Sequence, residues 1–157
     1  MVKINFLEKI IGSGFYTGYI PFASGTFASL IAALIFFIPG FEKSYIIIPA
    51  IVLSFIIGIP VGNKFEVTYG KDPAQCTIDE IMGMWISLFL IPKTIINVAI
   101  GFFIWRFFDI IKPYPARDLE KLKGGLGIMI DDFIAALYSL VTIHILLFIL
   151  NKVSFIK

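Results

Sequence analysis

Long apolar runs separated by short polar ones organise this sequence. Ser44–Gly62 contains 19 uncharged residues dominated by isoleucine, and Phe133–Leu150 contains 18 residues with one histidine and no formal charge. About 20 apolar residues cross the hydrocarbon core of a bilayer as a helix. Both runs therefore predict membrane-spanning helices. Phe27–Phe41 is a shorter apolar run, and we expect a third span there.

The apolar segment Ile81–Trp105 is interrupted at its centre by Pro92 and Lys93. A lysine at the centre of a bilayer costs about 2.5–3.5 kcal/mol. The two halves, Ile81–Pro92 and Thr94–Trp105, would each reach only about 18 Å at about 1.5 Å per residue. Basic residues follow both this segment and the second span, and the positive-inside rule places both loops on one side. The pattern therefore favours a hairpin of two short helices over a single crossing.

The N-terminal pattern is different in kind. Val2–Ile11 is amphipathic and predicts a short helix lying at an interface, and the glycine-rich stretch Gly12–Pro21 predicts a loop or broken helix.

Taken together, the pattern predicts one domain over residues 1–157. Its fold class is all-α, a multihelical integral membrane protein with about three spanning helices plus the hairpin.

The composition agrees with a bilayer as the solvent. Hydrophobic residues make up 59% of the chain and charged residues 15%, whereas soluble chains carry about 25% charged residues. The mean hydropathy is +0.95. A single cysteine, Cys76, excludes a disulfide scaffold, and a net charge of +2 is too small to indicate a nucleic-acid partner.

Seven of the eleven carboxylates fall in three clusters. These are Asp79-Glu80, Asp109 with Asp118 and Glu120, and Asp131-Asp132. The first and last pairs each precede a long apolar run, so one interpretation is that they cap helix N-termini. Crowded carboxylates beside an apolar boundary usually persist because a cation neutralises them. Hard oxygen ligands in this number suit Mg²⁺.

Basic residues stand beside these acids. Arg106 precedes Asp109 by three residues, and Lys112 and Arg117 bracket a Pro-Tyr-Pro turn. Cationic side chains next to a carboxylate–metal cluster are suited to holding a phosphoryl group. The alternative is a basic flank that contacts lipid headgroups, which is the more natural interpretation for Lys121 and Lys123.

Three strings in this sequence resemble the phosphatidylglycerophosphatase A family. They are DEIMGMW at 79–85, RFFDIIKPYPAR at 106–117 and GGLGIMIDD at 124–132. The resemblance implies a Mg²⁺-dependent phosphatase with an all-helical fold. Such an enzyme converts phosphatidylglycerophosphate to phosphatidylglycerol and phosphate.

On this hypothesis each cluster has a role. The expected Mg²⁺ ligands are Asp79, Glu80, Asp131 and Asp132, the expected catalytic residues are Asp109, Asp131 and Asp132, and the phosphate-binding residues are Arg106, Lys112 and Arg117. Asp109 could act as a base, a metal ligand or a nucleophile. The partners are the phospholipid substrate and the membrane, with the site at the cytoplasmic face of a bacterial inner membrane.

Two alternatives come from other classes. Intramembrane acids often mark ion pathways, so a small membrane carrier or ion-coupling protein is one of them. A structural subunit whose acids only cap helices is the other. Release of phosphate from a lipid substrate distinguishes the enzyme from both.

Overall fold

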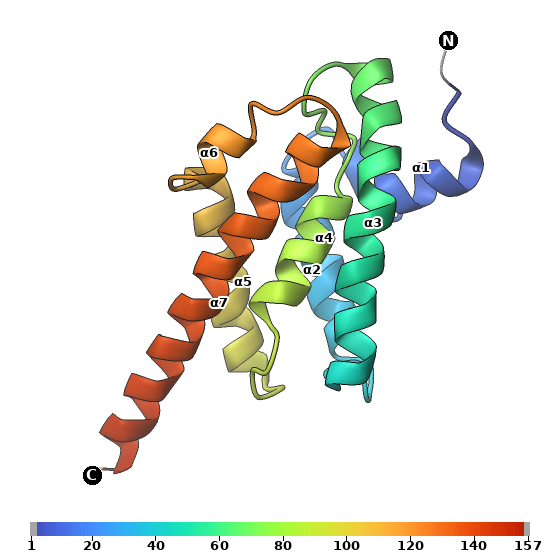
Figure 1. Cartoon of the computed structure of the whole chain (residues 1–157). Coiled ribbons are helices and arrows are strands. Elements are labelled where there is room, and N and C mark those ends of the chain that lie inside the picture. The colour runs from blue at the N-terminus through green and yellow to red at the C-terminus, as the bar shows by residue number, and fades with distance from the viewer. Residues whose placement is uncertain (1–2, 156–157) are drawn as a thin grey trace.

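Helices account for all the regular structure in the computed structural model, which describes residues 3–155 (Figure 1). The prediction of an all-α fold is confirmed. The helices, in chain order, are α1 (Phe6–Gly12), the 3₁₀ helix η1 (Thr17–Tyr19), α2 (Ser24–Phe36), α3 (Ser44–Tyr69), α4 (Ile78–Ser87), α5 (Ile95–Ile111), α6 (Ala116–Leu119) and α7 (Gly125–Phe155).

Two helices have the length and apolarity of a membrane span. They are α3, with 26 residues, and the part of α7 from Gly125 to Leu150. The third predicted span corresponds to α2, which has only 13 residues and is therefore about 20 Å long at about 1.5 Å per residue. This is well short of a bilayer core of about 30 Å.

The predicted hairpin is present as α4 and α5, which run in opposite directions and are joined at residues 88–94 (Figure 1). Its arms are unequal because α4 ends at Ser87, whereas α5 continues beyond Trp105 to Ile111. Lys93 lies in the connection, at the end of the bundle where α2 ends and α3 begins. Its ammonium group donates to the Ile38 carbonyl oxygen at 2.6 Å and pairs with Glu42 at 2.6 Å. The lysine charge is thus satisfied at a helix end.

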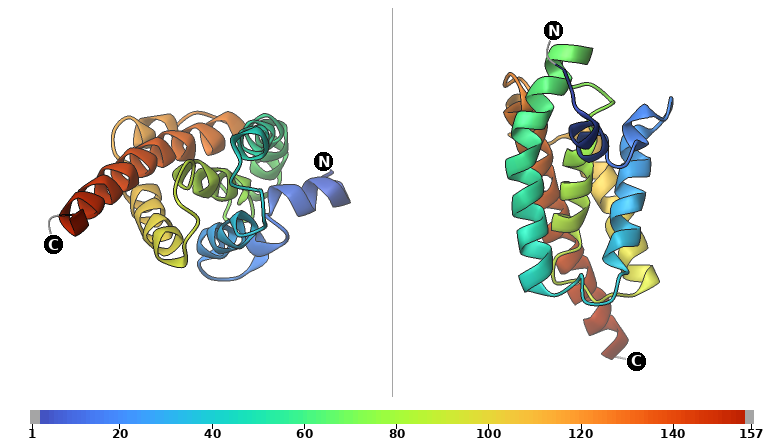
Figure 2. Two further views of the ribbon diagram at one scale, coloured as in Figure 1. Left: turned by 90° about the horizontal axis from the view of Figure 1, so that it is seen from below. Right: turned by 90° about the vertical axis from the view of Figure 1, so that its right-hand side faces the viewer.

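Helix α4 lies at the centre of the bundle, with α2, α3, α5 and α7 around it (Figure 2, left). Almost all of its residues are buried, which explains the unbroken apolar sequence after its first turn. Gly83 permits the contact with α5, because a Cβ atom there would lie 2.2 Å from Cη2 of Trp105. Trp105 is itself fully buried.

A short N-terminal helix is present, but it begins at Phe6 and not at the start of the predicted range, because Asn5 caps it. Helix α1 begins with a capping box, in which the Asn5 side chain accepts from the Glu8 amide and the Glu8 carboxylate accepts from the Asn5 amide. Glu8 also pairs with Lys64 of α3 at 2.5 Å. The glycine-rich stretch that follows forms turns and η1. Val2, the first residue of the predicted helix, lies outside the described residues.

This topology brings separate parts of the sequence to one end of the bundle. Helices α2, α4 and α7 begin there, and α3 and α5 end there (Figure 1). The acid-containing strings therefore meet, although Asp79 and Asp132 are 53 residues apart in sequence.

Candidate active site

A polar pocket of about 310 Å³ opens at this end of the bundle. It is lined by the start of α2, the loop before α4, the start of α4, the end of α5 and the second turn of α7. Its charged lining residues are Asp72, Asp79, Glu80, Arg106, Asp109, Lys112 and Asp132. Five of these seven residues are carboxylates, so the pocket has an excess of three formal negative charges.

Three of the carboxylates form a tight group. Asp79, Glu80 and Asp132 each offer an oxygen, and the three oxygens lie within 4.8 Å of one another. Asp79 and Asp132 are buried, and Glu80 is half-buried. Each of the three also has a buried oxygen without a hydrogen-bond partner among the described residues: Oδ1 of Asp79, Oε2 of Glu80 and Oδ2 of Asp132.

Burial makes ionisation of the α4 pair costly. It raises the pKa of Asp79 well above its usual value, and the neighbouring charge of Glu80 adds to this effect. Burial likewise raises the pKa of Glu80 to about 7. Both shifts arise because burial removes the hydration that stabilises the ionised carboxylates, and the charge of Arg106 offsets only part of this for Glu80. A bound cation would remove this cost.

The geometry of the group fits a small divalent cation. Mg²⁺ binds oxygen ligands at about 2.0–2.1 Å in an octahedron, so two of its ligands lie about 3–4 Å apart. The separations in the group of three are of this order. The unpartnered oxygens supply the ligand atoms that such an ion needs, and their number leaves positions for water or substrate.

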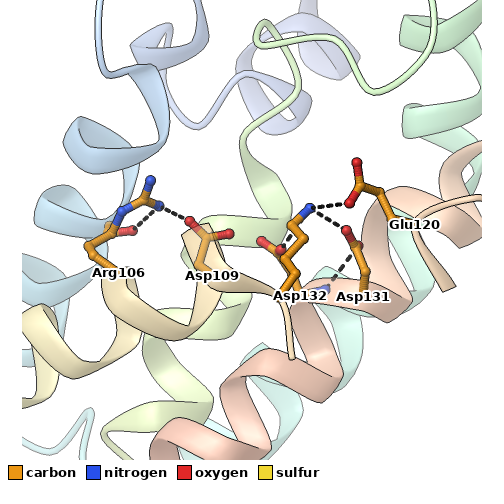
Figure 3. Close-up of polar contacts among 7 residues, drawn as sticks. Arg106, Asp109, Glu120, Asp131 and Asp132 are labelled. Carbon is orange, nitrogen blue, oxygen red and sulfur yellow. Dashed lines mark hydrogen bonds and ion pairs between the residues drawn. The ribbon is translucent and has the colours of Figure 1, made fainter. Parts of the chain in front are cut away.

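Asp131 points to a different partner. Its carboxylate forms an ion pair with the Lys112 ammonium group and accepts a hydrogen bond from the Asp132 amide at 2.9 Å (Figure 3). Lys112 also lies 3.8 Å from Asp132 and 3.8 Å from Glu120. The structure therefore separates the predicted pair: Asp132 joins Asp79 and Glu80, whereas Asp131 positions Lys112.

The carboxylates set the charge state of Lys112. Its burial alone would lower the pKa of the ammonium group, but the charges of Asp132 and Asp131 outweigh this and raise the pKa. Lys112 is therefore cationic at neutral pH. A permanent cation at the pocket wall is suited to binding a phosphate oxygen.

Arg106 forms the opposite wall of the pocket. Its Nη1 donates to Asp109 at 2.8 Å, as Figure 3 shows, and to Ser29 of α2 at 3.4 Å. The Ser29 hydroxyl also accepts a hydrogen bond from Trp105 at 3.0 Å. Nε of Arg106 has no hydrogen-bond partner among the described residues. The guanidinium group is thus held in place while one donor stays uncommitted.

The backbone at the rim is strained. Ala23, Asp72 and Lys112 all line the pocket and have φ values of 49°, 45° and 45°. The left-handed region is costly for residues other than glycine and recurs at functional sites. The start of α2 also lies close to these side chains. A Cβ atom at Gly25, the second residue of α2, would be 2.3 Å from Oε1 of Glu80 and 3.1 Å from Nη1 of Arg106.

The structure corrects the capping interpretation for one acid pair. Asp79 and Glu80 do lie in the first turn of α4. Asp131 and Asp132 do not begin a helix, because α7 starts at Gly125. The Gly125 amide is instead bound by the Asn63 side chain of α3 at 2.7 Å. The second pair is therefore inside α7 for a reason other than capping.

Other predicted site residues differ in their placement. Arg117 is exposed on α6 and is not part of the pocket lining. Asp72, which lies outside the three carboxylate clusters of the sequence, does line the pocket. Asp72 is exposed at the rim, and partial desolvation there raises its pKa. Ser29 was also missed, because only the packing of α2 against α5 shows its contact with Arg106.

Comparison with known proteins identifies relatives over most of the chain. A family model described as Phosphatidylglycerophosphatase A matches residues 10–147. Phosphatidylglycerophosphatase A of Haemophilus influenzae is 35% identical, over 90% of this chain and 90% of its own length. The protein of the same name from Escherichia coli is 33% identical, over 88% of this chain and 82% of its own length.

A third relative bears a different name. A Bacteroides thetaiotaomicron protein, named as a candidate phosphatidylinositol-3-phosphatase, is 37% identical over 92% of this chain and 96% of its own length. No solved structure matches the chain significantly. All three names describe phosphatases that act on phospholipids.

Proposed function

We propose that this chain, which belongs to the phosphatidylglycerophosphatase A family, hydrolyses phosphatidylglycerophosphate to phosphatidylglycerol and inorganic phosphate. The reaction breaks a phosphate monoester at the headgroup of a membrane lipid. The two apolar helices of span length suit a protein that meets such a substrate in the bilayer. We further propose Mg²⁺ as the cofactor.

The charge of the pocket is the observation that carries the proposal. A phosphate dianion would be repelled by a pocket with an excess of three formal negative charges. One bound divalent cation reduces that excess from three negative charges to one. The three unpartnered oxygens of Asp79, Glu80 and Asp132 mark where such a cation would be held. When bound, Mg²⁺ would offset the charge of the phosphoryl group and polarise it.

The remaining charged residues have separate tasks in this proposal. Arg106 and Lys112 bind the phosphate oxygens from opposite walls of the pocket, and Asp131 orients Lys112. Asp109, held by Arg106 at 2.8 Å, takes a proton from the attacking water. Phosphoryl transfer needs mainly positioning and charge neutralisation, and this set of residues is suited to both.

The site lies at one end of the bundle and not at its middle. We infer that this end lies at the cytoplasmic face of a bacterial inner membrane, because Lys71, Arg117, Lys121 and Lys123 are all found there. The lipid tails would then stay in the bilayer while the headgroup enters the pocket.

The direct test measures phosphate release by the purified protein in detergent. Long-chain phosphatidylglycerophosphate should be cleaved with Mg²⁺ and not after chelation. Phosphatidylinositol 3-phosphate and phosphatidic acid are the comparison substrates. No release from any lipid phosphate would contradict an enzymatic function and favour the carrier alternative. A preference for the inositol lipid would correct the substrate.

A variant pair tests the cation site. Glu80→Gln should reduce turnover at least about 100-fold, because a ligand and its charge are lost. It should also abolish the rise in Tm that Mg²⁺ produces in the wild-type protein. Asp118→Asn is the matched control, since Asp118 is exposed and, within residues 3–155, pairs only with the exposed Lys121. Full turnover in Glu80→Gln would remove that residue from the site.

A further inference from the structure

We propose that the apolar groove between α2 and α5 holds one acyl chain of the lipid substrate and thereby sets the position of its headgroup in the polar pocket. This inference rests on the proposed function. It assigns the acyl chain of the substrate to the groove between α2 and α5, in addition to the headgroup in the polar pocket.

The groove has a volume of about 310 Å³ and is lined only by apolar residues. Small side chains form its floor: Ala33 and Val98 are 5% and 4% exposed, and Ala99 lies beside them. Larger side chains form its walls, including Leu30 and Leu34 on α2 and Phe103 on α5. A small floor between large walls leaves a channel along the two helices.

The groove lies farther along the same two helices that contribute to the polar pocket. The same two helices line both, and they lie side by side in Figure 2. On α2, Leu30 of the groove follows Ser29, whose hydroxyl accepts a hydrogen bond from Arg106. On α5, Phe102 and Phe103 of the groove lie one turn before Arg106. The contact between Arg106 and Ser29 therefore marks the change from polar pocket to apolar groove.

The groove together with the turn of α5 up to Arg106 spans about one lipid leaflet. From Arg106 back to Ile95, the first α5 residue in the groove, there are 11 residues, or about 16 Å at about 1.5 Å per residue. Half of a bilayer core of about 30 Å is about 15 Å. Because a glycerol, a phosphodiester and the glycerol backbone separate the terminal phosphate from the acyl ester, a phosphate at Arg106 leaves the far part of the groove, toward Ile95, for the acyl chain.

We expect the groove to act mainly by positioning the headgroup of the bound lipid. A lipid tail gains little free energy by leaving other tails for an apolar groove, because both surroundings are apolar. A tail held along α2 and α5 does, however, fix the depth and direction of its headgroup. Misplacing a reacting group by about 1 Å can cost about 100-fold in rate. The groove should therefore affect long-chain substrates more than short ones.

The test fills the groove and varies the length of the acyl chains. Ala99→Phe adds a ring above the floor, and Ala99→Val is a milder version. We expect kcat/KM for phosphatidylglycerophosphate with sixteen-carbon chains to fall about tenfold or more in Ala99→Phe. The value for a substrate with four-carbon chains, too short to occupy the groove, should stay within about twofold. Ala99→Val should give an intermediate loss.

Ile96→Phe is the matched control, since Ile96 is an exposed α5 residue outside the groove. Equal losses on long and short substrates, or no loss in folded Ala99→Phe protein, would overturn the proposal. A shift from dimer to monomer with equal losses would assign the groove to self-association instead.

A second measurement does not depend on turnover. Phosphatidylglycerol with a photoreactive group near the end of one acyl chain should crosslink to residues 95–103 in the wild-type protein and less in Ala99→Phe. Crosslinking elsewhere, or unchanged crosslinking in the variant, contradicts the groove. If the wild-type protein cleaves neither substrate, the proposed function fails, and this measurement still decides whether the groove binds an acyl chain.

Discussion

Lys112 is the side chain on which most of the site's charge depends. Its ammonium group faces the buried carboxylates of Asp131 and Asp132. Lys112→Met should therefore destabilise the fold by about 3 kcal/mol, because two buried charges lose their partner. Thermal unfolding in detergent measures this. Adding Asp131→Asn should restore part of the loss, and a double variant no more stable than Lys112→Met would contradict the coupling.

The exposed pair of Lys121 with Asp118 supplies the control for that experiment. Its lysine side chain is 72% exposed, and exposed ion pairs contribute about 0–1 kcal/mol. Lys121→Met should leave Tm nearly unchanged. A similar loss in both lysine variants would point to a general effect of charge.

Ser29 positions Arg106 without contacting the substrate itself. Ser29→Ala removes the acceptor shared by Trp105 and Arg106, and an unsatisfied buried donor costs about 1–3 kcal/mol. We expect a lower Tm and a higher KM for the lipid phosphate, with a smaller change in kcat. Ser139→Ala is a close control, since the Ser139 hydroxyl is equally buried but has no hydrogen-bond partner among the described residues. An identical KM in Ser29→Ala and the wild-type protein would remove this role.

The sequence predicted most of these side chains from their chemistry. Carboxylates in an apolar chain need a cause, and Asp79, Glu80, Asp109 and Asp132 do line one pocket. The sequence could not separate Asp131 from Asp132, because the two differ only in the helix face they occupy. It could not show Asp72 either, since a loop acid is ordinarily solvated and its place at the pocket comes from the path of the chain.

Close packing of α3 against α7 carries Asp131 and Asp132 into the site. A Cβ atom at Gly125 would lie 2.0 Å from the Ile59 carbonyl oxygen, and one at Gly62 would lie 2.8 Å from Cα of Gly125. Gly125→Ala should force α7 away from α3 and weaken Mg²⁺ binding about tenfold or more. The Mg²⁺ concentration needed for half-maximal turnover measures this effect.

Leu126→Ala tests the same turn of α7 without the close contact, because Leu126 is 43% exposed. It should leave the Mg²⁺ requirement unchanged. Wild-type Mg²⁺ dependence in Gly125→Ala would show that the helices adjust without moving the carboxylates.

Helix boundaries that are set by neighbouring residues in the sequence were predictable. Boundaries that are set by contacts with residues far away in the sequence were not. The hairpin follows from Pro92 and Lys93 at the centre of one apolar segment. The start of α7 was placed too late, because the acid pair resembles a helix start, whereas the Gly125 amide is bound by Asn63, 62 residues away. The short α2 was extended into a span for a similar reason, since its apolar run continues beyond Phe36 into the turn.

The molecule as a whole has an asymmetry of basic residues that bears on its proposed orientation. Lys71, Arg117, Lys121 and Lys123 belong to the pocket end, whereas Lys93 at the opposite end is paired with Glu42. On the positive-inside rule, the orientation we propose has the pocket at the cytoplasmic face. This orientation can be tested by cysteine labelling, because we expect the native thiol to react poorly with a maleimide. Cys76 is 3% exposed, and burial raises its pKa.

Two single-cysteine additions report the two ends of the bundle. Lys121→Cys lies at the pocket end, and Ser44→Cys lies at the exposed start of α3 at the opposite end. A membrane-impermeant maleimide should label Lys121→Cys in inside-out vesicles only and Ser44→Cys in right-side-out vesicles only. The reverse pattern would place the pocket outside the cytoplasm. Labelling of both positions from one side would mean that α3 and α7 do not cross the bilayer, because a crossing helix necessarily separates its two ends.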